Sequence, residues 1–173
     1  MKKYIFGYGS LVNNESRFLT LKRHTEPIKV VLDSSYGYVR KWNYYNKEKN
    51  IIALGLEKQI TGNYVNGILF DVYDDEITLL DKREIGYEKI TILPSYINIL
   101  SKNKLQNMNN SIIYTYIPTM DYRLYNNIDY ISSNKLNQTY LNKCCVGFSS
   151  HNYDFYESFI NTTYDWNIFL QYV

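Results

Sequence analysis

Apolar residues recur in short runs and alternations through most of the chain, and this pattern predicts many strands. Tyr4 to Tyr8 form a short apolar first strand that ends at two glycines. Two apolar stretches on either side of NKEKN predict a β-hairpin, and YVNGILFDVY predicts a buried strand. A second hairpin is expected from YINIL and SIIYTYI, which flank a polar loop.

Two helices are predicted in the first half of the chain. Asn13 or Asn14 is expected to cap a short helix that runs to about Leu21. Asp74 or Asp75 is expected to cap a second helix, because short acidic side chains suit the first turn. Gly86 marks the end of that helix.

Two more helices are predicted near the C-terminus. Ser132 or Ser133 is expected to cap the first of them, and Gly147 is expected to stop it. The stretch NYDFYESFINTT supplies the last helix. Many strands with a few helices indicate an α+β fold with an antiparallel-rich curved sheet or small barrel. Neither a repeat nor a linker divides the 173 residues, so a single domain over 1–173 is expected.

Composition narrows the class of protein. Hydrophobic residues make up 45% and charged residues 21%, which is typical of a globular chain. The net charge of +2 is spread over both signs, which argues against nucleic-acid binding. Neither a membrane span nor a signal peptide is expected, and the adjacent Cys144 and Cys145 favour a reducing, cytoplasmic setting. The 20 tyrosines have AT-rich codons, so their number is weak support for a binding surface.

The stretch FGYGSL, directly after the first predicted strand, is the first candidate site. A glycine-rich turn can aim several backbone N–H groups at one point and so bind an anion such as a carboxylate. Its sequence fits neither a Walker loop nor a dinucleotide fingerprint. A plain tight turn with a buried tyrosine is the simpler explanation of the glycines, and the motif alone does not establish a binding site. Ser10 lacks a histidine in a recognisable motif that could activate it as a nucleophile.

Glu84 is the second candidate. At about 100° per residue it shares a helical stripe with Ile77 and Leu80, so it is expected to face the interior or a pocket. Burial and the helix C-terminus both raise the pKa of a carboxyl group there, which suits it to accept and return a proton. The structural alternative is an ion pair with Arg83, Lys82 or Lys89.

Together the two stretches resemble the γ-glutamylcyclotransferase-like superfamily, in which a Y-G-[ST]-x turn and an LD-x-x-E-x-x-Y-like helix end recur. The C-terminal ESFINTTYDW is similar to an ending found in some bacterial members. The residues that carry the resemblance are Tyr8, Gly9, Ser10 and Leu11, followed by Leu80, Asp81, Glu84 and Tyr87.

The resemblance implies a small mixed β-barrel flanked by helices. It also implies a reaction in which the α-amine of a γ-glutamyl group attacks its own side-chain amide, releasing 5-oxoproline and an amine, amino acid or peptide. No metal, nucleotide or other cofactor is implied. Glu84 would be the acid–base catalyst, and the turn from Tyr8 to Leu11 would hold the substrate. Tyr87 would form a hydrogen bond near Glu84 or serve as an aromatic residue of the core.

Several questions stay open from the sequence. The residues VNNESR after the turn do not match glutathione-specific members, so the leaving group is not specified. Loops 43–50 and 118–133 are expected to set the pocket width, and nothing demands an oligomer. One alternative is a non-catalytic binding or interaction module with the same barrel and turn. Another is an acyl-transfer enzyme with Ser10 or a cysteine as nucleophile, for which the sequence offers no basic partner.

Overall fold

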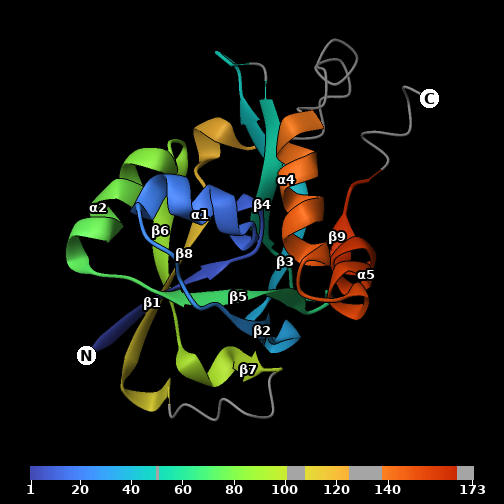
Figure 1. Cartoon of the computed structure of the whole chain (residues 1–173). Coiled ribbons are helices and arrows are strands. Elements are labelled where there is room, and N and C mark those ends of the chain that lie inside the picture. Colours follow the sequence, from blue (N-terminus) through green and yellow to red (C-terminus); the bar gives the residue numbers. More distant parts are fainter. Residues whose placement is uncertain (50, 101–107, 125–137, 167–173) are drawn as a thin grey trace.

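The computed structural model describes residues 1–49, 51–100, 108–124 and 138–166. Within these ranges the chain forms a mixed α+β fold with nine strands and four α-helices (Figure 1). The strands are β1 (Lys2–Gly7), β2 (Ile28–Leu32), β3 (Tyr38–Asn46), β4 (Ile51–Lys58), β5 (Val65–Asp71), β6 (Tyr87–Ile92), β7 (Ile97–Ile99), β8 (Ser111–Pro118) and β9 (Thr163–Tyr164). The helices are α1 (Asn14–Leu21), α2 (Asp74–Arg83), α4 (Gln138–Ser149) and α5 (Tyr153–Thr162).

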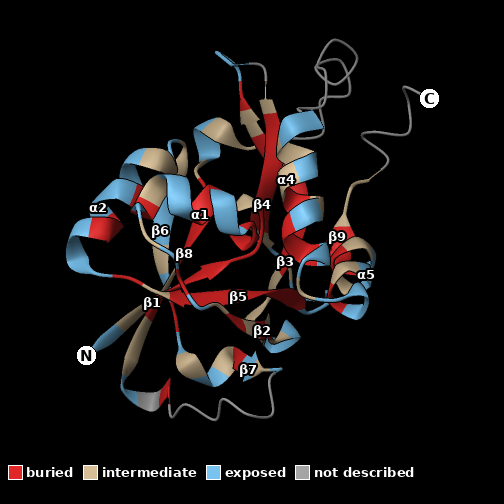
Figure 2. Ribbon diagram, viewed as in Figure 1, coloured by how far each residue is buried: buried red, intermediate tan, exposed pale blue. Residues whose placement is uncertain are grey.

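Six strands form the larger sheet, in the order β6-β8-β1-β5-β2-β7. Neighbouring strands are antiparallel except β1 and β8, which are parallel. The central strands β1 and β5 are covered on both faces, because consecutive residues, which point to opposite faces, are buried: Ile5 and Phe6 in β1, and Leu69 and Phe70 in β5. Figure 2 shows this buried centre beneath the helices. The end of β1 therefore delivers the glycine-rich turn into the interior of the protein.

Three strands form a second sheet, in the order β4-β3-β9. β3 and β4 pair in antiparallel fashion, which confirms the first predicted hairpin, and the register shifts between Lys41 and Tyr44. Both sheets are open in the described residues, so the expected closed barrel is wrong. β8 approaches β4 where Pro118 lies against Gly55, and a proline has no N–H with which to join the two ladders.

The second predicted hairpin is also wrong. β7 pairs with β2 at one edge of the larger sheet, whereas β8 lies between β6 and β1. The reason is burial: β8 contributes Ile113 and Ile117 to the core and suits an inner position, while β7 has only three residues. Alternation identifies a strand but does not name its partner.

The predicted N-terminal cap is confirmed for α1 and wrong for α2. Asn13 caps α1, because its side chain accepts a hydrogen bond from the Ser16 N–H (2.9 Å), as expected. The cap of α2 is Tyr73 rather than Asp74 or Asp75. The Tyr73 N–H donates to the Glu76 carboxylate (2.8 Å), so a side chain from inside the helix satisfies this end.

The expected stop at Gly147 is wrong, since α4 continues to Ser149. Gly147 instead lets α4 approach the backbone of Val12 and Asn13, where an added Cβ would lie only 2.6 Å from the Asn13 nitrogen. The predicted caps Ser132 and Ser133 lie outside the described residues, as does much of loop 118–133. Residues 43–46, expected in a loop, belong to β3.

Candidate functional site

The chain leaves β1 and forms a single 3-10 turn, Ser10–Val12, that Gly9 precedes. The N–H groups of Val12 and Asn13 donate to the carbonyls of Gly9 and Ser10 (2.9 and 3.1 Å). Within the described part of the chain, the N–H groups of Gly9, Ser10 and Leu11 have no acceptor, as is usual for the first residues of a helical turn. The turn therefore presents three unpaired donors.

Two buried arginines hold the carbonyl side of this turn. Arg40 donates to the Tyr8 carbonyl (3.3 Å), and Arg17 donates to the carbonyls of Leu11 and Val12 (2.8 Å each). Neither guanidinium has a carboxylate within ion-pair distance among the residues described, and burial lowers the pKa of both. Neither residue could be recognised from the sequence, because each lies alone in an ordinary helix or strand pattern.

Glu84 is placed at the other wall of the site by the end of α2. Its N–H donates to the Leu80 carbonyl (2.9 Å) and its own carbonyl accepts from the Tyr87 N–H (3.0 Å). Gly86, with a φ of +83°, then takes the left-handed conformation that turns the chain into β6. The Glu84 side chain is only 16% exposed.

Glu84, Tyr87 and the turn from Tyr8 to Leu11 all line one small cavity. All six residues singled out from the sequence thus meet in space. Its other lining residues are Phe6 and Gly7, which belong to the same FGYGSL stretch, and Leu54, Tyr116 and Tyr140, which sequence reasoning missed. The cavity volume is about 30 Å³, which has room for about one water molecule.

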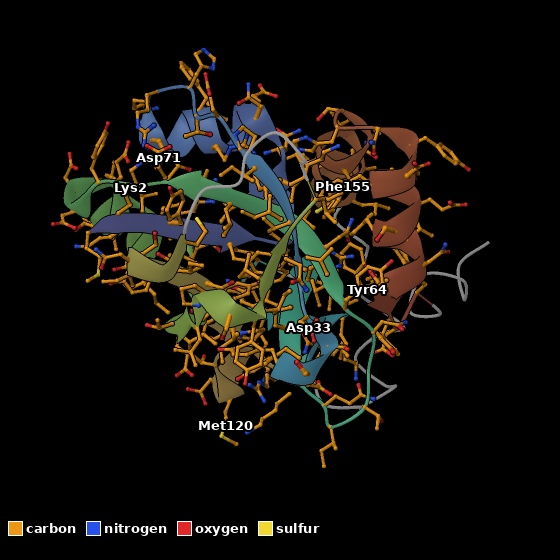
Figure 3. All side chains as sticks on the ribbon, turned by 90° about the horizontal axis from the view of Figure 1, so that it is seen from below. Lys2, Asp33, Tyr64, Asp71, Met120 and Phe155 are labelled. Atoms are coloured by element: carbon orange, nitrogen blue, oxygen red, sulfur yellow. The ribbon has the colours of Figure 1, made fainter. Side chains whose placement is uncertain are left out.

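Two larger hollows lie elsewhere on the surface, and Figure 3 labels two residues that line each of them, Lys2 and Asp71 for one, Tyr64 and Phe155 for the other. The first has a volume of about 810 Å³ and the second a volume of about 530 Å³. Neither contains Glu84 or the glycine-rich turn. The two larger hollows are therefore separate from the predicted site, and the candidate acid–base, Glu84, lines the small cavity.

The charge state of Glu84 results from two opposing effects. Burial raises the pKa of its carboxyl group above the ordinary glutamate value, because the ionised form is poorly solvated. The guanidinium of Arg83, with its Nε 3.0 Å from Glu84 Oε1, lowers the pKa but only in part. A carboxyl group of raised pKa beside a cation can accept a proton and return it.

Tyrosine hydroxyls surround the carboxylate. Tyr87 donates to the Leu54 carbonyl (2.7 Å), and Tyr140 accepts from the Leu54 N–H (3.3 Å). Tyr8 donates to the Tyr116 carbonyl (2.6 Å). Burial raises the pKa of Tyr8, Tyr87 and Tyr140 well above the ordinary value, so these hydroxyls are neutral at pH 7.

The fold of the chain is similar to that of several solved structures. A γ-glutamyl cyclotransferase is 13% identical, with a TM-score of 0.65 over 94% of this chain and 88% of that one. A yeast γ-glutamyl cyclotransferase specific to glutathione is 11% identical, with a TM-score of 0.55 over 94% and 97%. An uncharacterized human protein is 14% identical, with a TM-score of 0.62 over 93% and 88%.

The chain has the γ-glutamylcyclotransferase-like fold. No protein-family model matches the sequence. No curated protein matches it either. At such low identity the likeness concerns the fold, and the assignment of site residues depends on the geometry above.

Within this fold, nucleophilic and metal chemistry find little support. Ser10 Oγ accepts a hydrogen bond from Arg83 (3.1 Å), and a guanidinium is a donor that cannot act as a base. Burial raises the pKa of the Cys144 thiol to about 12, so it is not a thiolate at pH 7. The described residues contain no group of three His, Cys, Asp or Glu side chains that could hold a metal. None of their helices is long and apolar enough to cross a membrane.

Proposed function

We propose that this chain is a γ-glutamyl cyclotransferase that acts on a small γ-glutamyl compound, with residues 1–173 serving as one catalytic domain. One observation carries the proposal: the Glu84 carboxyl group and the Tyr8–Leu11 turn line the same cavity. The fold shared with γ-glutamyl cyclotransferases supports it. Proton transfer and substrate holding are the two requirements of the reaction, and each has a candidate here.

In the proposed reaction the α-ammonium group of the substrate first loses a proton to the Glu84 carboxylate. The free amine attacks the γ-carbonyl carbon, a C–N bond forms, and the tetrahedral intermediate collapses as the original amide C–N bond breaks. Glu84 returns its proton to the leaving nitrogen, and the second proton of the attacking nitrogen also passes to the leaving amine, which departs as an ammonium group while the carboxylate is regenerated. The products are 5-oxoproline and the released amine, with no cofactor consumed.

The turn would bind the α-carboxylate or the reacting carbonyl through the N–H groups of Gly9, Ser10 and Leu11. This binding folds the substrate back on itself, so that amine and carbonyl are close before reaction. A γ-glutamyl group is larger than the cavity, so a wall must move on binding. Tyr140, whose hydroxyl lies over Gly9, is the side chain we expect to swing aside.

The second candidate function is a non-catalytic binding module with the same turn. The ion pair between Arg83 and Glu84 favours it, because a carboxylate held only for structure would be paired in this way. The burial of the pair beside the turn, rather than at the exposed surface, favours the enzyme.

The test is release of 5-oxoproline from γ-glutamyl dipeptides, glutathione and γ-glutamyl-amines, with wild type beside Glu84→Gln. The variant keeps the shape of the side chain and removes proton transfer. We expect a loss of about 10²–10⁴-fold in kcat with unchanged folding. Equal activity in both proteins would contradict the role of Glu84. If wild type cleaves none of the compounds but they raise its Tm, the binding module is correct.

A further inference from the structure

Arg83 occupies a position between the two halves of the site. It is the last residue of α2, and its guanidinium contacts Glu84 on one side and the Ser10 hydroxyl on the other. It also donates to the Ser16 carbonyl (2.7 Å), the Ser16 hydroxyl (2.9 Å) and the Thr20 hydroxyl (2.7 Å) in α1. One planar group therefore links α2, α1 and the turn.

These contacts use the guanidinium from every side. The Nε forms the ion pair with Glu84 Oε1. Nη1 donates to Ser16 and Thr20 of α1, and Nη2 donates to the hydroxyls of Ser10 and Ser16. The rigid fork of arginine holds its partners at fixed separations, which a flexible lysine ammonium does not. Because Ser10 accepts from Arg83, its own hydroxyl hydrogen is directed elsewhere, and Ser10 lines the cavity.

Arg83 is also the source of positive charge at Glu84. The other titratable groups that act on this carboxylate are tyrosines from four elements and the turn, namely Tyr8, Tyr44 of β3, Tyr87 of β6, Tyr116 of β8 and Tyr140 of α4. Burial raises the pKa of each, so all five are uncharged at neutral pH. Arg83 alone among these groups favours the ionised carboxylate.

We propose that Arg83 is a positioning residue that fixes the Glu84 carboxylate relative to the Tyr8–Leu11 turn and favours its ionised form, which accepts the substrate's proton. This inference rests on the proposed cyclotransferase function. A different role, a strap that only joins α1 to α2, uses the contacts with Ser16 and Thr20 and leaves the chemistry of Glu84 unaffected. The two roles predict different results when the contacts are removed separately.

The experiment compares Arg83→Gln, Arg83→Lys and Thr20→Ala with wild type, using the best substrate of the panel. Arg83→Gln removes the charge, and we expect kcat to fall about 100-fold with KM little changed, as for a displaced catalytic group. The acid limb of its pH–rate profile moves to higher pH, because the cation near Glu84 is lost. Arg83→Lys restores the position of that limb but not all of kcat. Thr20→Ala, which weakens only the strap, keeps both.

Direct titration of the Glu84 carboxyl by ¹³C NMR separates this inference from the proposed function. We expect a higher titration midpoint in Arg83→Gln than in wild type, whether or not the protein cleaves any γ-glutamyl compound. An unchanged midpoint overturns the role of Arg83 even in an active enzyme. A loss of activity in Thr20→Ala as large as in Arg83→Gln overturns it as well, in favour of the strap.

Discussion

Gly147 offers a test of how tightly α4 is packed on the site. It lies inside α4, where glycine costs about 1 kcal/mol relative to alanine in an exposed helix. Gly147→Ala would therefore stabilise an isolated α4. In the folded protein, however, the new Cβ would lie 2.6 Å from the Asn13 nitrogen and 2.9 Å from the Val12 carbonyl carbon. These are backbone atoms, which cannot rotate aside as a flexible side chain can.

The magnitude follows from the distance. An ordinary contact begins at 3.4 Å, so α4 and the backbone at Asn13 must separate by about 0.8 Å. Such overpacking costs about 1–3 kcal/mol, which equals or exceeds the gain in helix propensity. We expect a net loss of about 1 kcal/mol, or about 2–4 °C in Tm for a chain of this size. Because Val12 and Asn13 directly follow the site turn, kcat should fall by roughly 10-fold or more.

Thermal unfolding and 5-oxoproline release measure the two effects in the same samples. Val146→Ala is the matched control, since Val146 is the neighbouring residue of α4 and is 57% exposed. We expect it to leave both Tm and activity near wild type. A Gly147→Ala protein that melts above wild type with full activity would show that α4 is free to move, and would refute the argument.

Two further predictions concern Asn13 and Glu84. Asn13→Ala removes the cap of α1 and should lower the free energy of unfolding, measured by urea titration, by about 1 kcal/mol. Asn14→Ala, one residue inside the helix, is the comparison. Equal losses in the two variants would contradict the capping role of Asn13. Glu84→Gln should gain stability over wild type as pH rises. The folded-state pKa of Glu84 is raised, so below the unfolded pKa of about 4.3 both states are protonated, and above it ionisation favours the unfolded chain. Parallel stability–pH curves for the two proteins would contradict the raised pKa.

Local features of this chain could be predicted from its sequence because they depend on neighbouring residues. Asn13 caps α1 through a side chain that reaches the Ser16 N–H three residues on, and the two residues lie close in any helix. The position of Glu84 likewise follows from the helical period, which places it with Ile77 and Leu80. Helical periodicity does not predict that Glu84 meets the Tyr8–Leu11 turn; the family resemblance was needed to place them at one site.

Features that depend on distant residues could not be predicted. The alternation in β8 is the same whether β7 or β1 is its neighbour, so the predicted hairpin between β7 and β8 was wrong. Arg17 and Arg40 belong to ordinary helix and strand patterns, and nothing in their surroundings along the chain signals that both end at the carbonyls of one turn. Their burial without a carboxylate partner in the described residues is visible only in three dimensions.

The open arrangement of the two sheets explains where the cavity is. β4 is an edge strand of the second sheet, and the N–H and carbonyl of Leu54 are hydrogen-bonded to the hydroxyls of Tyr140 and Tyr87 instead of to a neighbouring strand. If β4 and β8 formed a continuous ladder, strand backbone would fill the space beside Leu54. Tyrosine hydroxyls satisfy these buried backbone groups at the end of a long side chain, so they leave room between the sheets. Some of the tyrosines, whose number codon usage explains, therefore take part in forming the site, and the cavity where Glu84 meets the turn is lined by Leu54 of β4 and Tyr116 of β8.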